Sequence, residues 1–179
     1  MPLPLTGLLV ALGLGSWANA LYFLGIGSKP SAGGVDPYRT VGWISFVTGL
    51  IIAGFGVIYL VTLPKAFGDQ LAVAVGGLAV AFGFIWVLLG IVQLQGLDLR
   101  PLGNICFWVG VFTVIFIWIF QGLFLFWSTM AIWAIGLFMV TAVSYGRLSP
   151  RVLGFWLLLF AIWTTFLPAA LISLGRPLF

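Results

Sequence analysis

The sequence contains no histidine and no glutamate, and only three aspartates and one cysteine in 179 residues. Without imidazole groups the chain has no histidine metal ligand, no histidine general base and no histidine pH sensor. The single cysteine, Cys106, can form neither an internal disulfide nor a cysteine metal site. We therefore expect no metal and no cofactor. With no acid–base pair within an apolar segment, the sequence also predicts that the protein is not an enzyme.

Charge is also scarce, at 6% of the residues, whereas soluble domains have about 25%. Apolar residues make up 63% of the chain and the mean hydropathy is +1.28. Such a chain cannot cover a water-facing surface, so we expect a single polytopic membrane domain over residues 1–179, embedded in a lipid bilayer. Long unbroken apolar runs exclude a β-barrel, which needs alternating polarity. The net charge of +4 is spread thinly over loops, which indicates topology and not nucleic-acid binding.

Six apolar stretches are long enough to cross a bilayer, which requires about 20 residues. We predict an all-α integral membrane fold with spans at about residues 5–26, 41–63, 71–94, 102–120, 123–144 and 152–174. The tract from 102 to 143 is too long for one crossing, and Gln121 and Gly122 divide it. No basic residue precedes the first apolar run, unlike a signal peptide, so we expect this run to be retained as a helix.

Three polar turns join the spans into three helical hairpins, and each turn contains proline and arginine. The residues are Asp36, Pro37 and Arg39 in the first turn, Asp98, Arg100 and Pro101 in the second, and Arg147, Pro150 and Arg151 in the third. Five Lys and Arg residues lie in these turns and two on the opposite side. The positive-inside bias then places the turns in the cytoplasm and both termini outside the plasma (inner) membrane. We expect the Asp98–Arg100 pair to stabilise its turn rather than to bind a ligand.

Glycines mark a helix face that another helix can approach closely. Gly76, Gly83 and Gly90 recur every seven residues in the third span. Because glycine has no side chain, such a repeat lets two helix backbones come into contact within a membrane.

The interior of the predicted bundle offers aromatic and weakly polar side chains but no charge. All seven basic and three acidic residues fall in loops or in the tail, which disfavours a proton- or sodium-coupled transporter. A small, neutral, planar solute could instead exchange hydrogen bonds with Asn19, Gln93 or tryptophan N–H groups. The same residues have simpler interpretations: an interhelical hydrogen bond for Asn19, and packing or anchoring at the membrane interface for each aromatic ring.

Three motifs, in order, resemble the AmiS/UreI family of urea and short-chain amide channels. Asn19 in the first span is followed by a loop that ends in Val35, Asp36 and Pro37. The third span carries Phe82, Gly83, Phe84 and Trp86, and then the turn Gly96, Leu97, Asp98, Arg100 and Pro101. A GRLSP turn at residues 146–150 and a late proline, Pro168, complete the resemblance.

This resemblance implies a six-helix protomer in a ring-shaped homo-oligomer, a hexamer, in which each protomer has its own pore. It implies that the permeant contacts Asn19, Phe82, Phe84, Trp86, Leu88, Trp127 and Trp133. The family's acidic residues in the last two spans are absent here, which implies a drier pore. The lack of histidine implies that there is no acid gating.

We therefore predict a passive, ungated channel for small neutral amides such as urea and acetamide-like solutes. The alternative hypothesis is a non-conducting structural or accessory subunit of a larger membrane complex.

Overall fold

The computed structural model describes residues 5–30, 33–34, 36–62, 69–119 and 124–175, and within these ranges it contains helices and turns but no strand. Five helices run unbroken: α1 (Leu5–Phe23), α2 (Pro37–Thr62), α4 (Asp69–Gln95), α5 (Arg100–Ile119) and α6 (Phe124–Ser144). The sixth crossing consists of α7 (Pro150–Phe160), the π-helix η1 (Ala161–Phe166) and α8 (Leu167–Ser173). In the described part of the chain six helical segments are long and apolar enough to cross a membrane, which confirms the predicted fold class.

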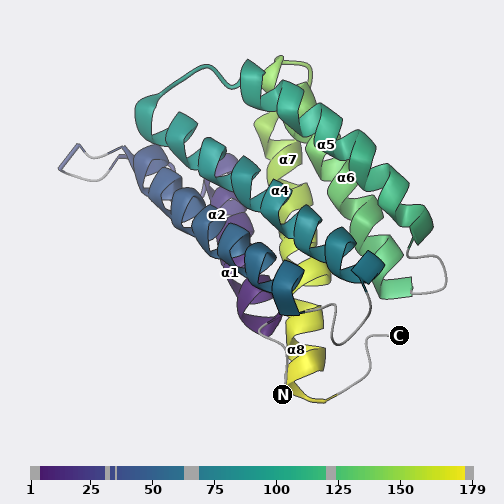
Figure 1. Cartoon of the computed structure of the whole chain (residues 1–179). Coiled ribbons are helices and arrows are strands. Elements are labelled where there is room, and N and C mark those ends of the chain that lie inside the picture. The colour runs from purple at the N-terminus through teal and green to yellow at the C-terminus, as the bar shows by residue number, and fades with distance from the viewer. Residues whose placement is uncertain (1–4, 31–32, 35, 63–68, 120–123, 176–179) are drawn as a thin grey trace.

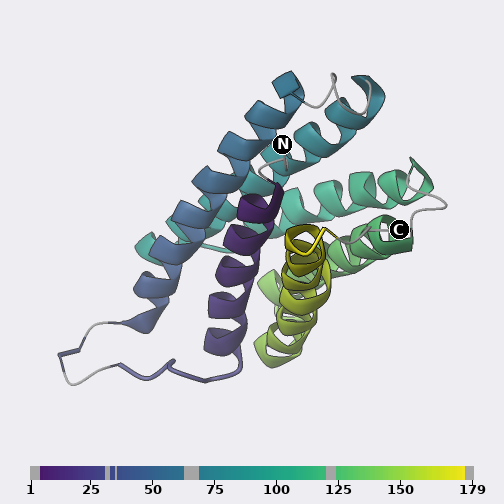
Figure 2. The ribbon, with the colours of Figure 1, turned by 90° about the horizontal axis from the view of Figure 1, so that it is seen from below.

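The helices are arranged so that the three predicted turns lie at one end of the bundle (Figure 1). We call this end the turn side. The start of α1 and the end of α8 lie at the opposite end, which we call the terminal side (Figures 1 and 2). The predicted link at 64–70 and the division at Gln121 and Gly122 lie partly or wholly outside the described residues, as do Val35, Lys65 and Arg176.

Two helices begin earlier than their predicted spans because proline starts them inside the polar turn. Helix α2 begins at Pro37, where the Asp36 carboxylate accepts a 2.9 Å hydrogen bond from the backbone N–H of Tyr38. Helix α7 begins at Pro150 in the same way, capped by the Ser149 hydroxyl. Proline suits the first helical position because the backbone N–H there has no intrahelical partner.

Helices α4 and α6, which precede the second and third turns, are each followed by a glycine that ends the helix. Gly96 and Gly146 have φ of 65° and 67°, a left-handed conformation that side chains disfavour. In both turns the N–H of the following residue returns to a carbonyl of the last helical turn, from Leu97 to Val92 and from Arg147 to Ala142. These bonds satisfy carbonyls that the helix end would otherwise leave unpaired.

Helices α2 and α4 pack more closely than any other pair, although no predicted hairpin turn joins them. A Cβ atom placed on Gly83 would lie 2.5 Å from the backbone nitrogen of Ala53, and one on Gly90 would lie 2.5 Å from that of Phe46. A Cβ on Gly76 would likewise meet Leu60. The close approach predicted from the seven-residue glycine repeat is therefore confirmed, and α2 is the helix that uses it.

A π-helix that was not predicted interrupts the sixth crossing. Pro168 has no N–H to bond to the carbonyl of Thr164, and its ring would clash with that carbonyl in a regular α-helix. The N–H of Leu167 bonds instead to Ile162, five residues back. The hydroxyls of Thr164 and Thr165 donate to the carbonyls of Phe160 and Ala161. One extra residue per turn thus accommodates the proline and shifts the register of the residues that precede it.

Candidate functional site

Two internal cavities lie along the bundle, one toward each side. The terminal-side cavity has a volume of about 90 Å³. Its walls come from α1, α2, α4, α6 and the last part of the sixth crossing, and they include Leu8, Leu12, Ile52, Tyr59, Leu78, Phe82, Thr129, Trp133, Thr164 and Pro168.

The turn-side cavity has a volume of about 160 Å³. Its walls come from α1, α4, α5, α6 and α7, and they include Asn19, Phe23, Phe82, Trp86, Cys106, Trp133, Leu137, Leu153 and Phe160. Among the described residues, neither wall contains an aspartate, lysine or arginine side chain.

Phe82 and Trp133 belong to the walls of both cavities and therefore lie between them. Their ring centroids are 4.2 Å apart with the planes inclined at 59°. The ring of Phe160 stacks with that of Trp133, at a centroid distance of 5.6 Å and an interplanar angle of 27°. The three rings come from α4, α6 and α7, and they form an aromatic barrier that we call the aromatic constriction.

Asn19 is fully buried and joins three helices through its amide. Its nitrogen donates to the backbone carbonyl of Gly15 at 3.0 Å and to the hydroxyl of Ser45 at 2.9 Å. Its oxygen accepts a 2.7 Å hydrogen bond from the side-chain nitrogen of Gln93. All three side chains are at most 1% exposed. The interhelical role that the sequence left open for Asn19 is thus present, and Asn19 also reaches the wall of the turn-side cavity.

Three buried polar atoms have no hydrogen-bond partner within the described part of the chain: the hydroxyl of Tyr59, the side-chain oxygen of Gln93 and the indole nitrogen of Trp133. Tyr59 lines the terminal-side cavity and Trp133 lines both. An unpaired polar group in an apolar environment costs about 1–3 kcal/mol. A solute carrying a carbonyl oxygen would satisfy the Trp133 and Tyr59 donors and remove that cost.

The structure brings together Asn19, Phe82, Trp86 and Trp133 of the seven residues expected to contact a permeant. Phe84 is 54% exposed and Trp127 is 38% exposed, and both lie on outer faces of the chain. Leu88 is half-buried against the core. These three line neither cavity.

The cavity residues Tyr59 and Phe160, and Ser45, which is the hydrogen-bond partner of Asn19, were not among the residues expected to contact the permeant. To predict Tyr59, Ser45 and Phe160, one would have to know which face of each helix is buried. A partial signal exists for the first two, because the weakly polar residues of α2 fall at Ser45, Thr48 and Tyr59 on its buried stripe. Positions three, four and seven residues apart share a helix face.

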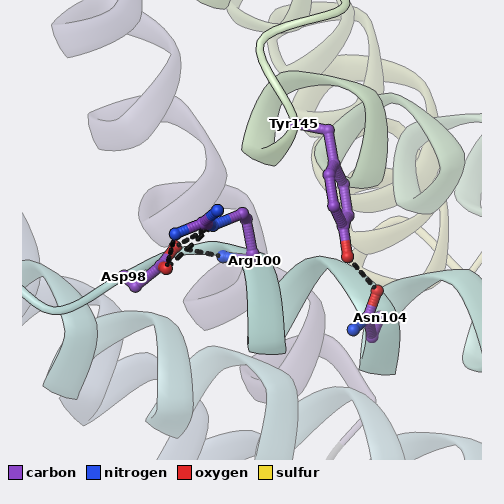
Figure 3. A network of polar contacts seen from close by, with 4 residues as sticks. All are labelled: Asp98, Arg100, Asn104 and Tyr145. Carbon is purple, nitrogen blue, oxygen red and sulfur yellow. Dashed lines mark hydrogen bonds and ion pairs between the residues drawn. The ribbon is translucent and has the colours of Figure 1, made fainter.

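The second turn is held by a compact ion pair. The Asp98 carboxylate accepts hydrogen bonds from the backbone N–H of Arg100 at 2.9 Å and from its guanidinium at 2.6 Å (Figure 3). These bonds hold the pKa of the Asp98 carboxyl below its usual range. Pro101 follows in the first turn of α5, where a missing N–H costs nothing. The pair is exposed and lines neither cavity.

No metal centre is evident in the described ranges, where no three His, Cys, Asp or Glu residues are grouped as ligands. The polar groups of the cavity walls are amide, hydroxyl and indole groups and the thiol of Cys106. Such groups are suited to hydrogen bonding with a neutral solute.

Two solved structures share the fold of this chain. The fold resembles the crystal structure of the urea channel from the human gastric pathogen Helicobacter pylori, with a TM-score of 0.77 and 15% sequence identity over 96% of this chain and 98% of that one. It also resembles the cryoEM structure of the Helicobacter pylori urea channel in a closed state, with a TM-score of 0.66 and 16% identity over 95% and 97% of the two chains. No curated protein sequence matches the chain.

Residues 31–176 match the sequence model of the AmiS/UreI family transporter, which covers most of the chain and confirms the resemblance found in the motifs. The family is one of transporters and not of enzymes, as expected from the missing acid–base groups. The protein is therefore a multi-pass membrane protein that belongs to the AmiS/UreI family of transporters.

Proposed function

We propose that the chain is a passive channel for urea and short-chain amides, which cross the aromatic constriction between the two cavities. The observation that carries this proposal is the unpaired indole N–H of Trp133, buried between two uncharged cavities. A urea or amide carbonyl can accept this hydrogen bond as the solute passes. The Helicobacter pylori proteins of the same fold, which are urea channels, support the choice of permeant.

The uncharged walls favour neutral solutes over ions. Moving an ion from water into a low-dielectric interior costs several kcal/mol unless a charged or strongly polar partner compensates. Neither cavity offers a charged partner among the described residues. Because Phe82 and Trp133 are in contact, we infer that the solute displaces these two rings as it crosses.

The terminal-side cavity supports amides as additional permeants. Apart from Tyr59, Thr129, Thr164 and the Trp133 indole, its walls are apolar. A methyl group such as that of acetamide would be buried there at a gain of about 25 cal/mol per Å². We infer that transport is ungated by protons, since no carboxylate or amine lines the described walls and the chain has no histidine.

We further propose that both termini are extracytoplasmic, in the plasma (inner) membrane, and that the chain assembles into a homo-hexamer. The support for the orientation is the excess of Lys and Arg on the turn side. The support for assembly is the broad apolar outer face of α2, which includes Trp43, Val47, Leu50, Val57 and Val61. Lipid could also cover this face, and cross-linking followed by mass measurement would distinguish the two.

The experiment is stopped-flow light scattering of liposomes that contain the purified protein. Urea and acetamide should equilibrate faster than in empty vesicles, whereas guanidinium, the charged planar analogue of urea, should not. Urea permeability should vary less than twofold between about pH 5 and pH 8 if no group in the walls titrates there. Urea kinetics equal to those of empty vesicles would refute the channel.

The contact between Phe82, Trp133 and Phe160 favours one competing function. A chain sealed at this point would be a non-conducting subunit of a larger membrane complex. In the same liposomes that function predicts no acceleration for any solute. It also predicts that mild solubilisation from the native membrane recovers the chain with a different protein bound.

A further inference from the structure

A third hollow lies outside the permeation path, on the turn side between α5 and α6. It has a volume of about 290 Å³ and is open to the surroundings. It is lined by Asn104, Phe107, Trp108, Thr141, Tyr145 and Arg147. None of these residues lines the two internal cavities, so this hollow, which we call the α5–α6 pocket, is a separate site.

The pocket presents one cation that has no acidic partner in the described part of the chain. Arg100, one helical turn before Asn104, is neutralised by Asp98 at 2.6 Å. Arg147 is exposed and makes no ion pair within the described ranges. The pocket wall itself contains no carboxylate among those residues. An anionic group is therefore the complementary ligand at this point.

Hydrogen-bonding groups lie beside that cation. The hydroxyl of Tyr145 donates to the side-chain oxygen of Asn104 at 2.7 Å, which fixes both side chains across the two helices (Figure 3). In this arrangement the Asn104 amide nitrogen remains available as a donor and the Tyr145 oxygen as an acceptor. The Thr141 hydroxyl holds α6 to α5 by donating to the carbonyl of Gly103 at 2.8 Å.

The other end of the pocket is apolar and continues along α5. Trp108 is 63% exposed and Phe112 and Ile115 are also exposed, at positions four and seven residues further on. Residues with this spacing form one helix face. A ligand that binds Arg147 with an anionic head can therefore lay an apolar chain over this face, toward the middle of the bilayer.

We propose that the α5–α6 pocket binds the headgroup of one anionic phospholipid from the leaflet that faces the three turns. The phosphate contacts Arg147, the polar backbone of the lipid contacts Asn104 and Tyr145, and an acyl chain covers Trp108 and Phe112. Basic pockets between membrane helices bind anionic headgroups through the same combination of charge and apolar contact.

Native mass spectrometry of the full-length protein tests this proposal, with equal amounts of phosphatidylglycerol and phosphatidylcholine added in detergent. We expect the wild type to retain phosphatidylglycerol in preference. Arg147→Gln should weaken that retention about fivefold, the effect of one juxtamembrane cation. The matched control is Arg151→Gln, which removes an exposed arginine of the same turn that does not line the pocket. Equal losses in the two variants would show general charge attraction and overturn the proposal.

Further experiments distinguish a bound lipid from other possible ligands of the α5–α6 pocket. Trp108→Ala should shorten lipid retention without altering the charge, whereas retention unchanged by this variant would exclude acyl contact. Inorganic phosphate should not displace the lipid; if it does so at similar concentration, the site is a phosphate site and the proposal fails. An Arg147→Cys variant that cross-links two copies of the chain in membranes would assign the pocket to an interface between copies and also overturn it.

Discussion

The two sides of the aromatic constriction differ in how far their buried polar groups are hydrogen-bonded. On the turn side, the Asn19 amide is satisfied by Gly15, Ser45 and Gln93. On the terminal side and within the constriction, the Tyr59 hydroxyl and the Trp133 indole are buried with no partner in the described part of the chain. Both sets are enclosed by apolar side chains, so the same kind of desolvation cost applies to each. The Asn19 network recovers most of that cost within the protein and leaves the Gln93 side-chain oxygen unpaired, whereas the Tyr59 hydroxyl and the Trp133 indole recover none of it within the described part of the chain.

This difference helps to distinguish polar groups that stabilise the fold from polar groups that are available to a solute. A network in which most donors and acceptors are paired stabilises the arrangement of its helices. An unpaired buried donor lowers stability, and a functional role such as hydrogen bonding to a passing solute is one explanation for its presence. The comparison therefore indicates that Asn19 holds α1, α2 and α4 together, and we propose that Trp133 contacts the permeant.

The largest effect should follow from disrupting the paired side. Asn19→Leu would leave the Ser45 hydroxyl and the Gln93 amide buried without their partner. We expect the free energy of unfolding to fall by about 1–2 kcal/mol, the upper range for interhelical hydrogen bonds in membranes. Thermal unfolding in detergent measures this.

The matched control for that variant is Asn104→Leu. Asn104 is the same residue type in a helix, but it is exposed and its partner Tyr145 can bond to water instead. Its stability should change by less than about 0.5 kcal/mol. If both variants lose the same stability, the turn-side network has no special structural role.

Removing an unpaired donor should affect transport rather than stability. Trp133→Phe keeps an aromatic ring beside Phe82 but deletes the indole N–H, and we expect urea permeability to fall about fivefold, within the range of one net hydrogen bond. Trp156→Phe serves as control because the Trp156 indole already donates to the carbonyl of Ile132 at 3.1 Å. That variant should lose more stability and less permeability. The opposite result would contradict the division between the two sides.

Sequence alone was sufficient for the family, the six crossings and the glycine face of α4, because these depend on composition and on short-range spacing. It was insufficient for deciding which face of a helix turns inward. Phe82 and Phe84 are separated by about 200° around α4, since an α-helix has about 3.6 residues per turn. With apolar residues on every face, nothing in the pattern distinguishes the buried Phe82 from the exposed Phe84.

The same reasoning explains the residues that were missed. Tyr59 and Phe160 gain their positions from helices far away in the sequence, and Phe160 also depends on the register shift of the π-helix next to it. The signal for that shift was present in the sequence, since Pro168 stands four residues after Thr164. Trp127 and Trp133 are both tryptophans of the fifth span, but they are six residues apart, and Trp127 lies on an outer face.

The variant Tyr59→Phe tests the unpaired hydroxyl on the terminal side by itself. Tyr59 lines the terminal-side cavity and is not one of the three rings of the aromatic constriction, so we propose that a solute meets it away from the narrowest contact between rings. We expect urea permeability to fall about twofold, less than for Trp133→Phe, with stability unchanged or slightly raised because an unsatisfied buried group is removed. A clear loss of stability would mean that the hydroxyl has a structural partner.

The smallest effect is expected at the exposed pair of the second turn. The pKa of Asp98 is depressed by its hydrogen bonds to Arg100, so the pair contributes stability above the ordinary carboxyl pKa of about 4 and loses it as pH falls through the depressed value. Asp98→Asn should therefore lower the unfolding temperature slightly at pH 7 and make no difference well below pH 4. Exposed ion pairs contribute little, and added salt should reduce the difference further. In an Arg100→Gln background the Asp98→Asn change should have no remaining effect at pH 7, because its partner is already gone. An undiminished effect there would show that the backbone hydrogen bond from Arg100, and not the ion pair, is what Asp98 provides to the turn.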